Sequence, residues 1–303
     1  MNEKYYHMAN PLNKLIGRFK KSVIRARYYN NYHRFPDLKN PKTWYEKIFW
    51  MVCNCDMSKW GRLADKYAVR DYVKQMWGED ILNELYGVYN TTAEIDYANL
   101  PEQFILKTNN GCASNVIVRD KSKLNIEETN HKLDRWLKLR LGNLTGQPHY
   151  MLITPCIIAE KLLIQDGDPT VSLTDYKFYC FNGVPRFVSM FANRREGTHL
   201  ADRNLYDMDW KSHPELFNEN NPSLKLTELP KPKNFDKMIE VAKALSVGFP
   251  FVRVDLYNID GKVIFGEMTF TPGMDGDYKD ETHLMLGDLI DLSLAPRLPQ
   301  RWE

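Results

Sequence analysis

Two acidic residues on either side of a predicted turn suggest a site for a divalent cation. Asp255 and Glu267 lie in two stretches of alternating apolar residues, which predict neighbouring strands. The dipeptide Asp260-Gly261 between them is typical of a tight hairpin turn. Carboxylates are ligands that Mg²⁺ prefers, usually together with substrate phosphates, so the pair indicates nucleotide triphosphate chemistry. An ordinary solvated strand face is the commoner explanation for two such acids, and a phosphate-binding element elsewhere is needed.

A lysine followed by a loop of small polar residues supplies a candidate for that element. Lys107 ends a predicted strand, and the loop after it contains Asn109, Asn110, Gly111, Ser114 and Asn115. An ammonium group offers a point charge, and small side chains let backbone N–H groups approach an anion. A hairpin loop with an exposed lysine explains the segment about equally well. Cys112 has no histidine close in sequence, so we expect a small loop residue rather than a nucleophile.

Two further segments could contact a nucleotide. Glu160, Lys161 and Leu163 close a predicted strand, where backbone groups could hydrogen-bond a flat base. Asp175 and Lys177 open the next predicted strand and add a carboxylate and a second cation. Neither segment is specific when taken alone.

Two arginines in a long predicted loop are candidates for catalysis. Guanidinium groups bind phosphate and carboxylate through two hydrogen bonds, so Arg194 and Arg203 could neutralise charge that develops during phosphoryl transfer. A single arginine is more often part of a surface ion pair. The order of the motifs along the chain is therefore more informative than any one residue.

The pattern of apolar residues predicts an α+β chain with a mostly helical beginning. Helical spacing covers residues 11–29, 43–52 and 60–76, and two later helices are expected at 125–141 and 234–247. Residues 193–233 read as a functional loop or a mobile lid. We divide the chain into a helical region at 1–90 and a larger domain at 91–303. Strands are expected at 103–107, 115–118, 156–164, 175–182, 184–192 and in the hairpin 250–268.

Composition limits the classes of protein that this chain can belong to. The 303 residues are 43% hydrophobic and 26% charged, which is typical of a globular protein and excludes a disordered or fibrous one. A net charge of +2 gives no general reason to expect nucleic acid as a partner. No apolar run is long enough to span a membrane, and no signal peptide is evident at the start, so we expect a cytoplasmic protein. Five cysteines without a C-x-x-C spacing predict reduced thiols.

Taken in order, these motifs resemble those of the ATP-grasp superfamily. The matching pieces are the lysine strand with its small-residue loop, the Glu-Lys-Leu-Leu hinge, the Asp-x-Lys strand, the arginine loop, and Asp255 with the Glu-x-Thr stretch from Glu267. Together with segments 41–47 and 64–70, they look most like the TupA-like ATP-grasp family of surface-polysaccharide biosynthesis. The resemblance implies an ATP-grasp fold, in which two α+β subdomains grip ATP.

The resemblance also implies roles for individual residues, with ATP and Mg²⁺ as cofactors. Lys107 would contact the α- and β-phosphates, the loop 109–115 would cover them, and Glu160, Lys161 and Leu163 would frame adenine. Asp175 and Lys177 would lie near the triphosphate. Arg194 would face the γ-phosphate, with Arg203 as a further cation. The implied Mg²⁺ ligands are Asp255, Glu267 and Thr269, where Thr269 replaces the usual asparagine and argues against a second ion. Arg253 could assist these ligands or form an ion pair.

The implied reaction is the ATP-dependent joining of a carboxylate and an amine through an acyl phosphate. A sugar acid such as a uronic acid, free, nucleotide-linked or part of a glycan, is the implied carboxylate in capsular or other surface-polysaccharide biosynthesis. The alternatives are a glycosyltransferase of the same pathway, an ATP-dependent kinase of a sugar hydroxyl, and a non-catalytic binding module. Basic residues in 11–29 could also contact an anionic membrane at its inner face, although a helix packed on its own protein explains them as well.

Overall fold

Two β-sheets, one antiparallel and one mixed, form the centre of the protein. The structure is a computed structural model that describes residues 19–111, 114–140, 142–165, 167–168, 170–195, 200–222, 224–274 and 276–298. The small sheet has the strand order β1-β4-β2-β3, with β1 (Leu85–Tyr89), β2 (Phe104–Thr108), β3 (Asn115–Val118) and β4 (Ile157–Lys161). The large sheet has the order β10-β9-β5-β6-β7-β8, and its β7/β8 pair is parallel. Its strands are β5 (Asp175–Phe181), β6 (Val184–Ala192), β7 (Asp202–Tyr206), β8 (Lys225–Leu226), β9 (Phe251–Ile259) and β10 (Lys262–Thr269).

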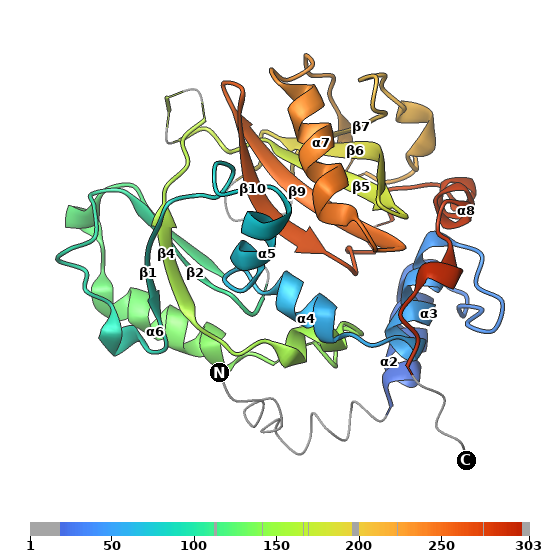
Figure 1. The fold of residues 1–303 in the computed structure, drawn as a ribbon, viewed down its shortest axis with the longest axis horizontal. Helices are drawn as coiled ribbons and strands as arrows, with labels where there is room; N and C mark the ends of the chain where they lie inside the picture. Colours follow the sequence, from blue (N-terminus) through green and yellow to red (C-terminus); the bar gives the residue numbers. More distant parts are fainter. Residues whose placement is uncertain are drawn as a thin grey trace.

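Helices cover the sheets and join them. Helix α6 lies along the small sheet and α7 along the large one, while α4 and α5 lie between the two sheets (Figure 1). Helices α2, α3 and α8 gather at the far end of the large sheet (Figure 1). The bounds are α2 (Lys20–Tyr32), α3 (Trp44–Asn54), α4 (Ser58–Ala64), α5 (Val69–Met76), α6 (Ile126–Lys138), α7 (Phe235–Ser246) and α8 (Asp280–Asp288).

Strand alternation decides which face of each sheet carries polar residues. In the small sheet, Phe104 and Leu106 pack with Leu133 of α6, so Lys107 points to the opposite face. In the large sheet, Phe178 stacks on Phe235 of α7 with ring centroids 5.9 Å apart. The neighbours of Phe178 along β5 therefore point away from α7, and this second face holds most of the candidate residues.

Helix α3 covers one end of that second face. It begins with a capping box, in which the Thr43 side chain accepts from the Glu46 N–H and the Glu46 carboxylate accepts from the Thr43 N–H. Trp44, which follows the cap, is buried against Tyr179 and Phe251, with ring centroids 5.2 and 5.3 Å away. The helical start of the chain thus belongs to the same core as the large sheet.

The structure differs from the sequence-based prediction in several elements. The helix expected at 60–76 is two helices, α4 and α5, separated by a turn at 65–68. The segment 193–233 is not only a loop, because it contributes β7 and β8 to the large sheet. Strand β1 and helix α8 were not predicted. The first helix is described from Lys20 onward, and the part of it expected at 11–18 lies outside the described residues.

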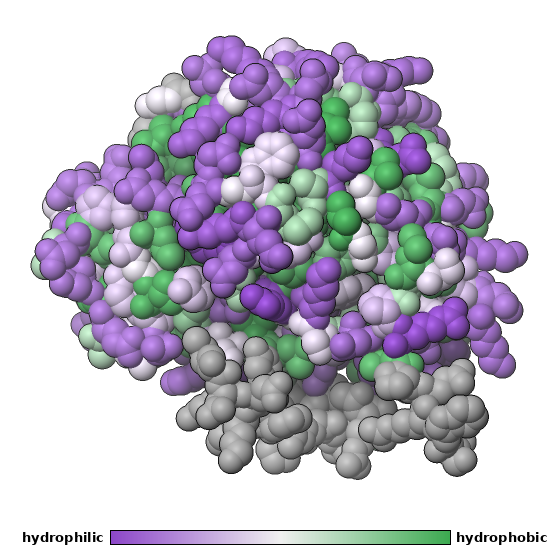
Figure 2. Space-filling model, in the orientation of Figure 1, coloured by the Kyte–Doolittle hydropathy of each residue, from purple (hydrophilic) through white to green (hydrophobic). Residues whose placement is uncertain are grey.

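The surface is mostly polar on the face shown in Figure 2, where hydrophobic residues form small separate patches. Within the described ranges, no helix is both long and apolar enough to cross a membrane. Four of the cysteines are free thiols, as expected, and three of these are buried, whereas Cys112 lies outside the described residues.

A buried histidine makes the stability of the fold sensitive to acid. His149 packs against Trp60 and Phe270, and neither of its ring nitrogens has a partner within the described part of the chain. Burial lowers its pKa from 6.5 to about 3. Because the folded-state pKa is depressed, this part of the stability is present above pH 6.5 and is lost as the pH falls toward about 3.

We expect His149→Phe to reduce this acid sensitivity. At pH 5, protonation of His149 in the unfolded chain lowers the free energy of unfolding of the wild type by roughly 2 kcal/mol. Urea unfolding at pH 8 and pH 5 should therefore show a drop in stability that is smaller by about that amount in the variant. His131→Gln, at an exposed position on α6, is the control and should keep the wild-type drop. An equal drop in His149→Phe and wild type would contradict the assignment.

Candidate active site

The hairpin of β9 and β10 brings Asp255 and Glu267 together through a bulge. Asp260 and Gly261 both have positive φ, 50° and 90°, as expected for a two-residue hairpin turn. Counting from this turn, an unbroken register would place Glu267 opposite Val254, on the face toward α7. The register shifts between Phe265 and Glu267, so that Glu267 pairs with Asp255 instead. The extra residue, Gly266, therefore turns Glu267 onto the polar face.

A single arginine lies at the centre of the predicted cation site. Nη2 of Arg253 donates to Asp255 Oδ2 at 2.6 Å, to Glu267 Oε1 at 3.1 Å and to Thr269 Oγ1 at 3.0 Å. Its Nε donates to Asp255 Oδ1 at 2.6 Å. The three predicted metal ligands thus already surround one cationic nitrogen. Two carboxylates and a hydroxyl offer the oxygen atoms that a hard cation prefers, so the donor set fits Mg²⁺.

Lys177 adds a second positive charge to this cluster. Its Nζ donates to Asp255 Oδ2 at 2.7 Å from the neighbouring strand β5. Burial alone would raise the pKa of Asp255, but the charges of Arg253 and Lys177 outweigh burial and hold it below its ordinary value. The nearby charge of Asp175, together with burial, raises the pKa of Tyr257 well above its usual range. Across the described ranges, no group of three or more His, Cys, Asp or Glu side chains forms a metal site of its own.

The three predicted catalytic cations gather around one aromatic ring. Lys177, Arg194 and Arg203 lie over Phe191 of β6, at 5.3, 5.8 and 4.6 Å from the ring centroid. Cations are attracted to the electron-rich face of such a ring. The structure therefore brings together residues from two strands and a loop, next to the Asp255 cluster.

The two arginines of this group are each held by a carboxylate. Arg194 Nη2 donates to Asp175 Oδ2 at 2.6 Å, so two candidate residues pair with each other. Arg203 lies on β7 and forms an ion pair with Asp277. With 37% of its side chain exposed, Arg194 is the more accessible, whereas 11% of the Arg203 side chain is exposed.

On the small sheet, Lys107 and Glu160 form a second charged cluster. Lys107 Nζ donates to Glu160 Oε2 at 2.9 Å, and Arg70 Nη1 donates to Glu160 Oε1 at 3.0 Å. Only 8% of the Glu160 side chain is exposed. A buried carboxylate of this kind needs such partners, because an unpaired charge is costly away from water. Arg70 comes from the N-terminal helical region, and no local spacing along the chain predicts this pairing.

The loop after Lys107 is held in place by its own polar side chains. Asn109 Oδ1 accepts from the Cys156 N–H at 2.7 Å, and its Nδ2 donates to Thr154 O at 3.0 Å. Asn110 Nδ2 donates at 3.2 Å to Trp136 O, at the end of α6. Residues 112 and 113 lie outside the described part of the chain. These contacts give the loop a fixed start, next to the carbonyl of Gly111.

The remaining predicted site residues of the loop 109–115 and of the segment 160–163 lie at the edges of the Lys107–Glu160 cluster. Ser114 Oγ donates to Thr108 O at 3.4 Å, and Asn115 pairs with Lys107 across β3 and β2. At the end of β4, the exposed Lys161 lies 3.5 Å from Glu84, and the half-buried Leu163 follows it. The structure thus brings the small-sheet candidates onto three adjacent segments.

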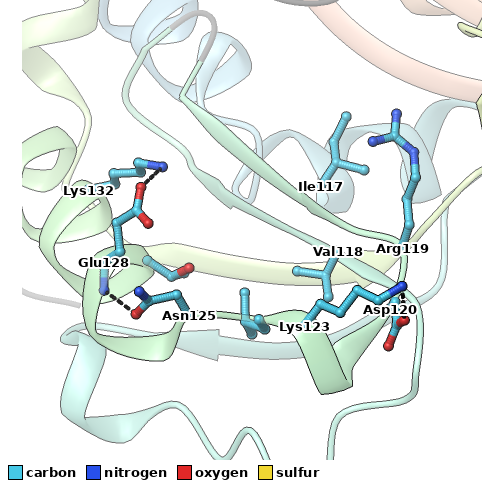
Figure 3. Close-up of a pocket in the computed structure, with 10 residues that line it drawn as sticks. Ile117, Val118, Arg119, Asp120, Lys123, Asn125, Glu128 and Lys132 are labelled. Atoms are coloured by element: carbon cyan, nitrogen blue, oxygen red, sulfur yellow. Dashed lines mark hydrogen bonds and ion pairs between the residues drawn. The ribbon is translucent and has the colours of Figure 1, made fainter.

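A shallow groove elsewhere on the small sheet contains none of the candidate residues. It has a volume of about 400 Å³ and lies between the end of β3 and α6. Ile117 and Arg119 border one side of it, and Glu128 and Lys132 of α6 border the other (Figure 3). Two ion pairs line it, Lys132 with Glu128 and Lys123 with Asp120. We assign it no part in the candidate site.

Sequence reasoning missed several residues of the site. Arg253 was considered only as a helper, although it contacts all three predicted metal ligands. No motif points to Phe191 or Asp277, because a lone aromatic or acidic residue carries no local signal. Alternation along 184–192 could have placed Phe191 on the polar face.

The arrangement of two sheets with facing helices and two charged clusters is that of an ATP-grasp fold. The chain belongs to the TupA-like ATP-grasp family, because the family model described as TupA-like ATPgrasp matches residues 46–291. This confirms the resemblance inferred from the motifs. No curated protein sequence matches the chain significantly.

Several solved structures are similar to the chain at low identity. A D-alanine–D-alanine ligase from Bacillus anthracis complexed with ATP is 14% identical, with a TM-score of 0.46 over 78% of this chain and 66% of that one. A D-alanine–D-alanine ligase from Helicobacter pylori is 16% identical, with a TM-score of 0.41 over 78% and 60%. A phosphoribosylamine–glycine ligase from Thermotoga maritima is 14% identical, with a TM-score of 0.41 over 74% and 51%. The chain thus spans two thirds or less of these proteins, and such similarities carry no argument about its chemistry.

Proposed function

We propose that this protein is an ATP-dependent carboxylate–amine ligase. The observation that carries the proposal is the convergence of Asp255, Glu267 and Thr269 on one cationic nitrogen of Arg253, in a chain of the ATP-grasp family. The sheet face that holds them also carries the cations around Phe191. Together these groups supply what phosphoryl transfer needs, which is fixed positive charge and an oxygen-lined cation site.

In this proposal the protein binds ATP with residues of both sheets. Lys107 holds the α- and β-phosphates, the loop 109–115 covers them, and Glu160, Lys161 and Leu163 frame adenine. Asp255, Glu267 and Thr269 would hold Mg²⁺, which would supply positive charge beside the triphosphate. The division into a helical region at 1–90 and an ATP-grasp domain at 91–303 is part of the same proposal.

The reaction then needs no nucleophilic side chain. A carboxylate oxygen of the substrate attacks the γ-phosphorus while the bond to ADP breaks, which gives an acyl phosphate. An amine attacks the acyl carbon and loses a proton, and phosphate leaves. Lys177, Arg194 and Arg203 stabilise the charge on the transferred phosphoryl group and orient the reactants.

The finer assignment concerns the substrates and the place of action. We propose a sugar acid, such as a uronic acid within surface-polysaccharide biosynthesis, and a small amine as substrates. Helix α2 contains no acidic residue, and Arg25 and Tyr29 on the helix and Phe35 just after it are exposed, which supports contact with an anionic membrane at the cytoplasmic side. Sedimentation with anionic but not with neutral vesicles is expected, and equal sedimentation with both would remove this part of the proposal.

An isotope experiment tests the reaction class. With a carboxylate substrate labelled with ¹⁸O, a ligase of this kind transfers one labelled oxygen to inorganic phosphate, together with ADP and an amide. A panel of uronic acids and amines should be screened first for ADP release. A phosphorylated sugar with ADP indicates the kinase alternative, and a new glycosidic bond without ATP consumption indicates the glycosyltransferase. Either product, or unlabelled phosphate beside the amide, would contradict the proposal.

A further inference from the structure

The turn between α4 and α5 and the first turn of α5 contact both proposed nucleotide-binding elements of the small sheet. Lys66, in this turn, donates through Nζ to the carbonyl oxygen of Gly111 in the loop after Lys107. Arg70, in the first turn of α5, donates to Glu160 Oε1 at 3.0 Å and to Asn83 O at 2.8 Å. Two cations four residues apart thus reach two segments that are separated by almost fifty residues in sequence.

The turn itself is fixed by Asp65. The Asp65 carboxylate accepts from the Tyr67 N–H at 2.8 Å and the Ala68 N–H at 3.1 Å. It also hydrogen-bonds the side chain of Asn109, the first residue of the proposed phosphate-binding loop 109–115, here called the phosphate loop. An aspartate carboxylate that accepts hydrogen bonds from backbone donors two and three residues further on holds the turn in one conformation. Lys66 is therefore directed at Gly111 by a rigid support.

The same helices are anchored to the large sheet and its helix. Trp60 of α4 stacks on Phe270, just after β10, with ring centroids 5.0 Å apart and an angle of 12° between the planes. The hydroxyl of Tyr72 in α5 donates to Leu245 O of α7 at 3.0 Å. Helices α4 and α5 lie between the two sheets, as Figure 1 shows. They therefore connect the part that carries Asp255 and Glu267 to the part that carries Lys107.

Glu160 shares its charge between two cations, and this sharing has a consequence for ATP binding. Lys107 bonds one carboxylate oxygen and Arg70 the other, at 2.9 and 3.0 Å. When Lys107 turns to a phosphate, Glu160 loses one partner. Only 8% of the Glu160 side chain is exposed, so leaving this carboxylate without any cationic partner would cost free energy. Arg70, with 14% of its own side chain exposed, remains to hold the carboxylate in place.

We propose that Lys66 and Arg70 are positioning residues of the nucleotide site, Lys66 for the phosphate loop and Arg70 for the Glu160 hinge. This inference rests on the proposed function. It assigns a part of the ATP site to the N-terminal helical region, outside the two sheets. The two residues act on different parts of the nucleotide, because Gly111 lies in the phosphate loop and Glu160 at the predicted adenine hinge.

Affinities for ATP and for adenosine separate the two roles. Losing a hydrogen bond from a charged donor typically weakens binding about tenfold. Lys66→Met should lower the affinity for ATP about tenfold and leave the affinity for adenosine unchanged. Arg70→Met should lower both affinities. Arg70→Lys should restore part of the affinity for both ligands. Lys74→Met is the matched control, because Lys74 lies on α5 and pairs with the exposed Glu79, and it should bind like wild type.

The outcomes distinguish this inference from the proposed function. Calorimetry measures these affinities. The inference is wrong if Lys66→Met binds ATP with wild-type affinity. It is also wrong if Lys66→Met loses as much affinity for adenosine as for ATP, because that result indicates a general loosening of the site. Lys66→Gln keeps a hydrogen-bond donor and replaces the methionine variant if that variant does not fold. Its affinity for ATP should fall by a smaller factor. Wild-type affinity for ATP in Lys66→Gln would again contradict the role of Lys66. A wild-type protein that binds neither ATP nor adenosine would instead contradict the proposed function.

Discussion

Glu267→Gln is expected to abolish Mg²⁺-dependent ATP turnover while the protein stays folded. Glu267 is one of two carboxylates around the cation position, and its amide would supply a neutral and weaker oxygen ligand. Loss of one group that stabilises charge in a transition state typically lowers the rate about 10²–10³-fold. Because glutamine has the size and shape of glutamate, the substitution leaves the packing of this half-buried side chain unchanged. Steady-state ADP release over a range of Mg²⁺ concentrations measures the effect.

A control separates the cation site from a general loss of negative charge. Glu240→Gln makes the same chemical change at an exposed position on α7, on the other side of the large sheet. It should keep wild-type turnover and wild-type Mg²⁺ dependence. Full activity of Glu267→Gln would show that Glu267 is not a metal ligand.

The second large effect concerns Arg253 and the binding of metal without nucleotide. Nη2 of Arg253 lies among the same oxygens that would hold the metal, so a divalent cation and this nitrogen exclude each other. We expect Mn²⁺ alone to bind the wild type weakly. Arg253→Met should bind Mn²⁺ at least about tenfold more tightly without nucleotide, because the cation then replaces the lost positive charge. Electron paramagnetic resonance of free Mn²⁺ measures both affinities.

The control for Arg253 must remove one positive charge from the same face. Arg194→Met does so, but Arg194 pairs with Asp175 rather than with the metal ligands. It should therefore leave the affinity for Mn²⁺ alone nearly unchanged. Equal tightening in both variants would mean that net charge, and not the position of the guanidinium, governs metal binding.

The sequence predicted the hairpin acids but not the geometry that joins them. Asp260-Gly261 correctly predicted the turn, and alternation correctly predicted both strands. Strict counting from that turn places Glu267 on the wrong face, and only the bulge at Gly266 corrects it. A glycine within a strand signals such a bulge, but its position relative to the partner strand depends on tertiary packing.

Long-range contacts explain the other residues that sequence reasoning missed. Local propensity predicted a continuous helix through 65–68, whereas Asp65 ends α4 and begins a turn. This turn brings Lys66 into contact with Gly111, which is distant in sequence. Strand β7 was predicted as loop because its polar residues show no clear alternation, yet it pairs with β6 over five residues. Partners such as Arg70 for Glu160 lie 90 residues apart, and no spacing rule indicates them.

Ligand-dependent stability most directly tests the claim that the two sheets form a nucleotide site. Thermal unfolding should be measured with ATP, with and without Mg²⁺, for the wild type and for Lys107→Ala. At a ligand concentration of about 100 times Kd, binding to the native state raises the midpoint of a protein of this size by about 4 °C. We predict that rise for the wild type with Mg²⁺ and ATP, and its loss in Lys107→Ala. A wild-type midpoint that does not move with ATP, or an equal rise in the variant, would contradict the account.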